Sequence, residues 1–257
     1  MRKIIDEMNI EVCMQNEKYS NIYLFLGDFF VFTHYKNLTD KLLQEKYNVF
    51  IFEYSKPKLE GEYSETFLDI FQNLHTTYHL CGEDILIGHS KGAHIVMLMS
   101  QILGMQAKYI LLNPLIRVRG LKAQTNISLV LECMRSVLFH HNIQLTFKTF
   151  VKRFMDEEIP DDVKRNIFEY CKPIGVRGYL SPTIIDEYLP NTYTIFYSKE
   201  DNAIDSLLLK EKIKYLEENW KLGFKLFSWS GGHCNFMFSD DENIQKLLIE
   251  IRNIAGD

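Results

Sequence analysis

The sequence comprises 257 residues, long enough to bury a large core, and we expect a single domain over residues 1–257. Hydrophobic residues make up 46% and charged residues 25%, and 18 Phe and 14 Tyr make the chain rich in aromatic side chains. A net charge of -5 offers no basic surface for a phosphate backbone, which argues against nucleic-acid binding.

The amino-terminal residues do not resemble a secretory leader. Asp6 and Glu7 fall where a signal peptide needs a continuous apolar stretch, and no apolar run approaches the length of a membrane span. We therefore expect a cytoplasmic protein without a membrane span. The five cysteines are odd in number and lack C-x-x-C spacing, which predicts free thiols and neither a disulfide framework nor a zinc site.

Short apolar runs alternate along the chain with amphipathic stretches, a pattern typical of parallel strands joined by crossover helices. The expected strands are 22–26, 48–52, 84–87, 109–112, 193–196 and 224–227. The expected helices are 38–47, 65–79, 91–103, 206–220 and 235–254. Most of these strands are continuously apolar, which indicates a mostly parallel sheet covered by helices on both faces.

The alternation is interrupted at about residues 116–190. Three helical segments are expected there, at 127–139, 147–155 and 161–170, and no strand. This stretch precedes the strand at 193–196 and predicts a helical lid inserted into the domain, with a plain structural layer as the alternative. Its aromatic residues favour an apolar acyl group as part of the substrate.

The sequence Gly88-His89-Ser90-Lys91-Gly92 fits the G-x-S-x-G pattern and joins an expected strand to an expected helix. The two glycines permit a tight corner that lifts the serine hydroxyl out of the sheet. Ser90 would then lie at a helix N-terminus, where free amides favour developing negative charge. The sequence predicts Ser90 as a nucleophile and the Lys91 backbone amide as one oxyanion donor.

A serine needs a base and an orienting acid, and both follow in the order Ser, Asp, His. Asp201 lies in the polar loop after the strand at 193–196, with Glu200 and Asp205 as competing carboxylates. His233 lies in a glycine-rich loop after the last strand and is the one histidine downstream of Asp201. Asn113, at the end of the strand at 109–112, is an amide and a poor alternative acid.

These motifs resemble the α/β-hydrolase superfamily from about residue 20 to the C-terminus. The stretches Gly88-His89-Ser90 and Gly231-Gly232-His233, the latter followed by Phe236 and Phe238, are also similar to type II thioesterases of assembly lines. The resemblance implies the fold of the superfamily, with a helical lid before the strand carrying the acid. Gly27 matches the glycine of a His-Gly motif common in the superfamily, which implies a second oxyanion donor at the amide of Asp28 or Phe29. The carboxylate of Asp28 would oppose an oxyanion unless it points away.

The sequence thus predicts hydrolysis of an ester or thioester through an acyl enzyme, with Ser90 attacking, His233 as base and Asp201 orienting it. We expect no cofactor and no metal, and a small-molecule acyl substrate, either free or bound to a carrier protein. Two alternatives remain open: an acyltransferase or cyclase that uses the same triad, and a hydrolase-fold binding protein without turnover.

Overall fold

In the computed structural model, the described residues are 2–5, 8–54, 72, 75–77, 79–102, 107–118, 120–122, 124, 127–140, 142–143, 145–157, 159–171, 174–175, 188–238 and 241–256. The expected helix at 65–79 lies mostly outside these residues.

Eight strands form one sheet in the order β1-β2-β4-β3-β5-β6-β9-β10. Their bounds are β1 (Arg2–Ile5), β2 (Met8–Cys13), β3 (Asn21–Phe25), β4 (Asn48–Tyr54), β5 (Ile85–His89), β6 (Lys108–Leu112), β9 (Thr192–Ser198) and β10 (Gly223–Trp229). The six neighbouring strands β4, β3, β5, β6, β9 and β10 pair in parallel. At one edge, β1 and β2 form an antiparallel hairpin, and β2 pairs antiparallel with β4. The mostly parallel sheet is confirmed, and the six expected strands are present. β1 and β2 were not expected from the sequence.

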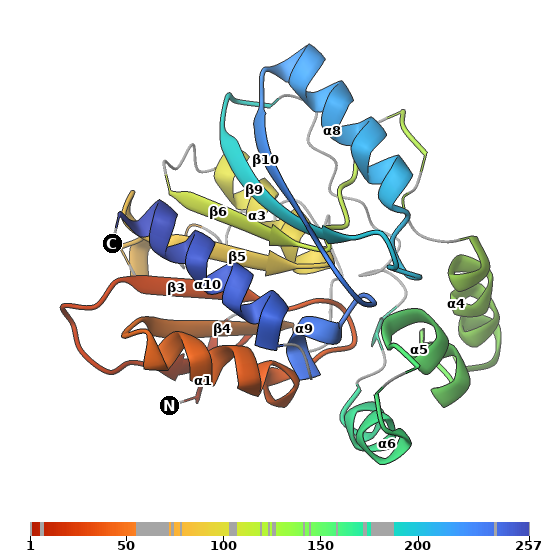
Figure 1. Ribbon diagram of the computed structural model, residues 1–257. Helices are drawn as coiled ribbons and strands as arrows, with labels where there is room; N and C mark the ends of the chain where they lie inside the picture. The colour runs from red at the N-terminus through yellow and green to blue at the C-terminus, as the bar shows by residue number, and fades with distance from the viewer. Residues whose placement is uncertain are drawn as a thin grey trace.

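Helices cover both faces of the sheet (Figure 1). One face carries α1 (Lys36–Gln44), which follows the 3-10 helix η1 (Phe32–Tyr35), and α10 (Asp241–Ala255); the other carries α3 (Lys91–Ile102) and α8 (Ser206–Trp220). Strand side chains alternate between two cores, so that Ile22 and Leu24 of β3 pack in the first while Tyr23 and Phe25 pack in the second. The expected helix at 235–254 is described as two helices, α9 (Asn235–Phe238) and α10.

The segment expected to form a lid contains α4 (Ile127–His140), α5 (Phe147–Phe154) and α6 (Asp161–Glu169). These helices lie together beyond one end of the sheet (Figure 1). The expectation of no strand there was wrong, because β7 (Asn142–Ile143) and β8 (Ile174–Gly175) form a small antiparallel pair. Two-residue strands are too short to show a period-2 pattern in the sequence. Within the described residues, no helix has the length and apolar character needed to cross a membrane.

Candidate active site

Ser90 occupies a sharp turn between β5 and α3. Its φ of 54° lies in the left-handed region, which is unusual for a residue with a side chain. The turn requires both flanking glycines: a Cβ on Gly88 would lie 2.5 Å from the Cα of Ala93, and one on Gly92 would lie 2.2 Å from the carbonyl oxygen of Phe25. The sequence thus folds into an elbow that leaves Ser90 partly exposed in an otherwise buried stretch.

His233 and Asp201 form a buried hydrogen-bonded pair. The distance from Nδ1 of His233 to Oδ2 of Asp201 is 2.6 Å, and the side chains are 0% and 2% exposed, respectively. The other carboxylate oxygen of Asp201 accepts hydrogen bonds from the amides of Ala203 and Ile204, both at 2.8 Å. These bonds fix the direction of the carboxylate toward the imidazole.

The two competing carboxylates have other partners. Glu200 accepts a hydrogen bond from the Gly231 amide at 2.6 Å. Asp205 is the N-cap of α8 and accepts from the amides of Leu207 and Leu208 at 2.9 and 3.1 Å. Of the three carboxylates in this loop, Asp201 is therefore the one bonded to the imidazole.

The second imidazole nitrogen of His233 is a buried acceptor. Because Nδ1 donates its proton to Asp201, Nε2 carries the lone pair, and no described residue forms a hydrogen bond with it. Hydrogen bonds between a catalytic base and its nucleophile are often loose in unliganded enzymes and tighten when substrate binds. The ring of Phe154 packs edge-on against the ring of His233 with centroids 5.4 Å apart, so an aromatic side chain of α5 contacts the imidazole.

The loop after β3 brings backbone amides to Ser90. A Cβ on Gly27 would lie 3.1 Å from the Cβ of Ser90, so the two segments are in contact. Within the described part of the chain, the amides of Asp28 and Phe29 have no hydrogen-bond partner. Phe29 has a φ of 73°, a strained conformation for an aromatic residue. The loop thus holds unpaired amides close to Ser90.

The Asp28 carboxylate lies 3.2 Å from the side-chain amine of Lys91, the residue that follows Ser90. Both side chains are largely shielded, at 14% and 10% exposure for Asp28 and Lys91. The Asp28 carboxylate was expected from the sequence to oppose an oxyanion unless it points away, but nothing in the sequence signals that it meets the Lys91 side chain. The ion pair offsets the charge that would otherwise oppose an oxyanion.

Backbone strain is concentrated at this place. Six described residues other than glycine have a positive φ, and Ser90, Phe29 and Asn113 are three of them. Asn113 lies directly after β6, and its side chain donates to the backbone carbonyl of His233 at 2.8 Å. Because strained residues persist only where the surrounding structure holds them, they tend to mark functional sites.

Solved structures with the same architecture were found by comparison. A bromoperoxidase from Bacillus anthracis superposes with a TM-score of 0.68 at 13% identity, over 95% of this chain and 95% of that chain. A carboxylesterase from Nitrososphaera gargenis gives 0.67 at 12% identity, over 100% and 99%. An extracellular α/β-hydrolase from a Paenibacillus species gives 0.64 at 14% identity, over 90% and 98%. No protein-family model matches the sequence, and no curated protein matches it significantly.

The chain has the α/β-hydrolase fold. In this fold the described site lies at the carboxyl ends of parallel strands, where open α/β sheets bind their ligands.

Among the residues described in this α/β-hydrolase fold, one cluster of three metal-ligating side chains comprises His89, His233 and Cys234, with ligand atoms within 4.8 Å. Three of the four imidazole nitrogens already have hydrogen-bond partners, namely the Tyr35 hydroxyl, the His233 carbonyl and the Asp201 carboxylate. Burial, followed by the charge of Asp201, raises the pKa of the Cys234 thiol well above its ordinary value. A protonated thiol is a poor ligand, so the cluster lacks a complete donor set for a metal.

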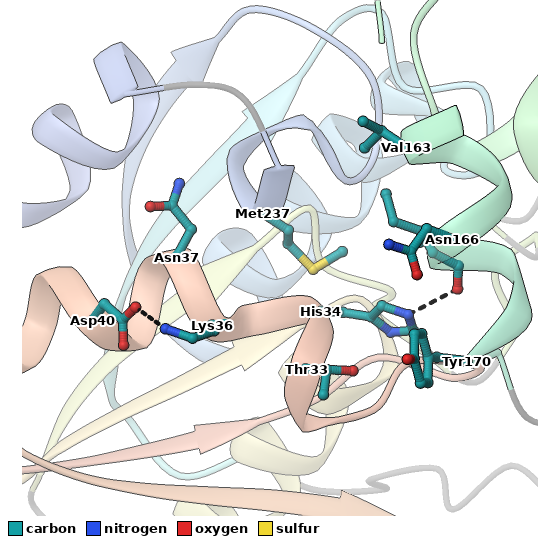
Figure 2. Close-up of a pocket in the computed structure, with 10 residues that line it drawn as sticks. Thr33, His34, Lys36, Asn37, Asp40, Val163, Asn166, Tyr170 and Met237 are labelled. Carbon is teal, nitrogen blue, oxygen red and sulfur yellow. Dashed lines mark hydrogen bonds and ion pairs between the residues drawn. The ribbon is translucent and has the colours of Figure 1, made fainter. Parts of the chain in front are cut away.

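A separate pocket of about 460 Å³ opens between α6 and the segment formed by η1 and α1 (Figure 2). Thr33 and Asn37 line one side, Asn166 and Tyr170 line the other, and Met237 of α9 lies between them. None of the ten lining residues belongs to the predicted triad. The pocket therefore contributes no group to the chemistry of Ser90.

Proposed function

We propose that the protein is a serine hydrolase that cleaves an ester or thioester of an apolar acyl group through an acyl enzyme. The observation that carries this proposal is the buried 2.6 Å hydrogen bond between His233 and Asp201, in a chain whose elbow serine directly follows His89, the residue whose Nε2 lies 3.2 Å from the His233 carbonyl. Such a pair holds one imidazole tautomer and stabilises the imidazolium that forms when the base takes a proton.

In this mechanism Ser90 attacks the carbonyl carbon while Nε2 of His233 removes the hydroxyl proton. Asp201 stays ionised and keeps Nδ1 protonated. In this proposal the tetrahedral oxyanion accepts hydrogen bonds from the Lys91 amide and from the amide of Asp28 or Phe29. His233 then protonates the leaving group, and water, activated by the same imidazole, releases the acid.

Aromatic side chains support an apolar acyl group. Phe29 and Phe30 of the loop after β3 face Phe154 of α5, with ring centroids 6.1 and 5.9 Å from it. Phe150, which is fully buried, packs against Phe154 with ring centroids 5.4 Å apart and extends the cluster. Acyl groups are held by walls of this kind, while a few polar groups fix their orientation. The carboxylesterase from Nitrososphaera gargenis, which shares the fold, adds support for an ester.

The decisive experiment is labelling of the purified protein with a fluorophosphonate probe, followed by intact mass measurement. We expect one probe per chain in the parent and none in Ser90→Ala, with labelling of His233→Ala slowed by about 1,000-fold or more. Labelled parent would justify assays with esters and thioesters of increasing chain length.

The negative outcome has a defined meaning. A folded parent that reacts with neither probe nor ester would favour a binding protein that keeps the triad without turnover. If the parent is labelled but transfers its acyl group to an amine or alcohol rather than to water, the acyltransferase alternative holds; mass spectrometry of the products distinguishes the two. A carrier-bound substrate, the cytoplasmic location and the single-domain organisation stay predictions from the sequence.

A further inference from the structure

The loop that carries the proposed base has a backbone with large intrinsic conformational freedom. His233 follows two consecutive glycines, and Gly231 has a φ of 84°. Glycine gains more conformational freedom than other residues when a chain loosens. A misplacement of about 1 Å in a catalytic group can reduce a rate by about 100-fold. Contacts from outside the loop must therefore fix the imidazole.

The backbone carbonyl of His233 is held by two side chains from other strands. Nδ2 of Asn113, at the end of β6, donates to it at 2.8 Å, and Nε2 of His89, the last residue of β5, lies 3.2 Å from it. Both side chains are buried, at 1% and 0% exposure. A carbonyl oxygen has two lone pairs, and these two donors use both.

Position 113 requires an amide. Oδ1 of Asn113 accepts hydrogen bonds from the Ser198 amide at 2.9 Å and from Nε1 of Trp229 at 3.1 Å, so the other end of the same side chain must be the donor. The φ of 40° also suits asparagine, which tolerates the left-handed region better than most residues. A carboxylate here could accept both bonds but could not donate to His233.

The tautomer of His89 follows from its neighbours. The His233 carbonyl can only accept, so Nε2 of His89, 3.2 Å away, carries the ring proton and donates to it. Nδ1 of the neutral ring is then an acceptor, and the Tyr35 hydroxyl, which accepts from the Gly27 amide at 3.1 Å, donates to Nδ1 at 2.6 Å. Burial, followed by the charge of His233, lowers the pKa of His89 well below its ordinary value, so the ring stays neutral. A continuous chain of donors thus runs from the loop beside Ser90 to the backbone of His233.

We infer that Asn113 and His89 are positioning residues that hold the catalytic histidine by its backbone carbonyl, with Tyr35 fixing the orientation of His89. Neither side chain takes part in proton transfer, and their effect reaches the reaction through the place of the His233 ring. This inference rests on the proposed function, because it assigns a role in turnover.

The test compares kcat and KM for a short-chain p-nitrophenyl ester. Asn113→Asp keeps both accepted bonds and the left-handed backbone but removes the donor, and we expect kcat to fall about 100-fold while KM changes less than about 3-fold. His89→Leu should lower kcat about 10-fold, and His89→Gln, whose amide can donate to the same carbonyl, should recover most of that loss. Asn219→Asp, an exposed amide on α8, is the control and should match the parent.

A second readout does not depend on turnover. The proton between His233 and Asp201 should give a low-field NMR resonance in the parent, and Asn113→Asp should shift or broaden it. Folded variants that keep the parent's kcat, or that lose activity through KM alone, would overturn the inference. If Asn113→Asp does not fold, the comparison of His89→Leu with His89→Gln decides. If the parent neither reacts nor labels, the proposed function fails, and the NMR signal alone then decides whether Asn113 and His89 hold His233.

Discussion

At the scale of single residues, the site depends on which carboxylate meets the imidazole. Asp201, Glu200 and Asp205 lie within five residues of one another in the sequence, yet each has a different role in the structure. Asp201 meets His233, Glu200 holds the Gly231 amide, and Asp205 caps α8. Replacing each of these three carboxylates by a neutral side chain should therefore have a different effect.

Replacing Asp201 by asparagine should abolish most of the activity. An amide at this position can donate to Nδ1 and so stabilise the wrong tautomer, which lowers kcat by about 10,000-fold in other Ser-His-Asp enzymes. We expect a loss of about 1,000- to 10,000-fold in kcat for Asp201→Asn with an ester substrate. Asp205→Asn, which keeps a capping oxygen, is the matched control and should stay within about 2-fold of the parent. Equal losses in both variants would contradict the assignment of Asp201.

The ion pair of Asp28 and Lys91 gives a second prediction for single residues. Lys91→Met leaves a shielded carboxylate without its cation beside the proposed oxyanion donors, and we expect kcat to fall about 10-fold or more. Adding Asp28→Asn to Lys91→Met removes the charge and should restore most of the activity. A double-mutant cycle in kcat measures the coupling. If the double variant is as slow as Lys91→Met, the carboxylate is not the cause.

At the scale of elements, α5 is the helix that meets the catalytic loop. Its last residue, Phe154, packs against the ring of His233, and its carbonyl accepts a hydrogen bond from the Cys234 amide at 3.2 Å. Asp156, two residues later, accepts a hydrogen bond from Asn235. This helix thus contacts the His233 ring and also holds the loop that carries it.

Shortening Phe154 should change both stability and substrate preference. Phe154→Ala removes a side chain that is 5% exposed, and cavities of this size cost about 3 to 5 kcal/mol of unfolding free energy. The space left beside His233 should move the preference in kcat/KM toward longer acyl chains. Urea unfolding and a series of p-nitrophenyl esters measure the two effects. Leu138→Ala on α4, where the side chain is 78% exposed, should change neither. An unchanged chain-length profile in folded Phe154→Ala would show that the aromatic cluster does not bind the acyl group.

At the scale of the whole molecule, two buried neutral histidines join separate parts of the fold. His89 links the loop after β3 to the His233 loop. His34 accepts a hydrogen bond from the Val31 amide at 3.0 Å, and its Nε2 lies 3.0 Å from the carbonyl of Ile167 in α6. Burial lowers the pKa of both imidazoles. The folded state therefore disfavours their protonation.

Acid should destabilise the protein from about pH 6.5 downward. The unfolded chain binds a proton at each of these histidines near pH 6.5, whereas the folded chain does not, so unfolding takes up protons and is favoured as the pH falls. For His89 the expected loss is about 1 kcal/mol between pH 6.5 and 5.5. Urea unfolding at pH 7.5, 6.5 and 5.5 should show a shallower pH dependence in His89→Gln than in the parent. Parallel curves for the two proteins would contradict a neutral His89.

The sequence predicted the parallel sheet and the elbow because both depend on local patterns. Apolar runs mark buried strands wherever they occur, and the corner at Ser90 needs glycines two residues before and after it. β2 has no continuous apolar run, because Met8, Ile10 and Val12 alternate with Asn9 and Glu11, and β1 has only two apolar residues, Ile4 and Ile5. An expectation based on continuous apolar runs therefore omits both strands. The strand order and the lengths of the connections cannot be deduced from such patterns.

The supporting contacts of the site could not be predicted from the sequence. Tyr35 and His89 are 54 positions apart, and Asn113 and His233 are 120 apart. Their meeting depends on the order and stagger of β3, β5 and β6. The Lys91 side chain gave no signal either, because its identity is free in the G-x-S-x-G pattern. The alignment of strands that are distant in the sequence therefore determines which polar and charged side chains surround the site. Local sequence patterns indicate only which residues are proposed to react.

The hydrogen bonds that hold the His233 loop have a consequence for the order of events during refolding. The loop is held by Asn113 after β6, His89 of β5, Glu200 after β9 and Asn243 of α10, which bonds the Ser230 carbonyl. Of these four residues, Asn243 alone is near the loop in the sequence, so we expect His233 to reach its place only after the central strands and the last helix have assembled. Recovery of turnover after dilution from denaturant should consequently lag behind recovery of helical signal. Enzyme activity would then report on the last step of folding, and a collapsed intermediate with native secondary structure would be silent in the assay.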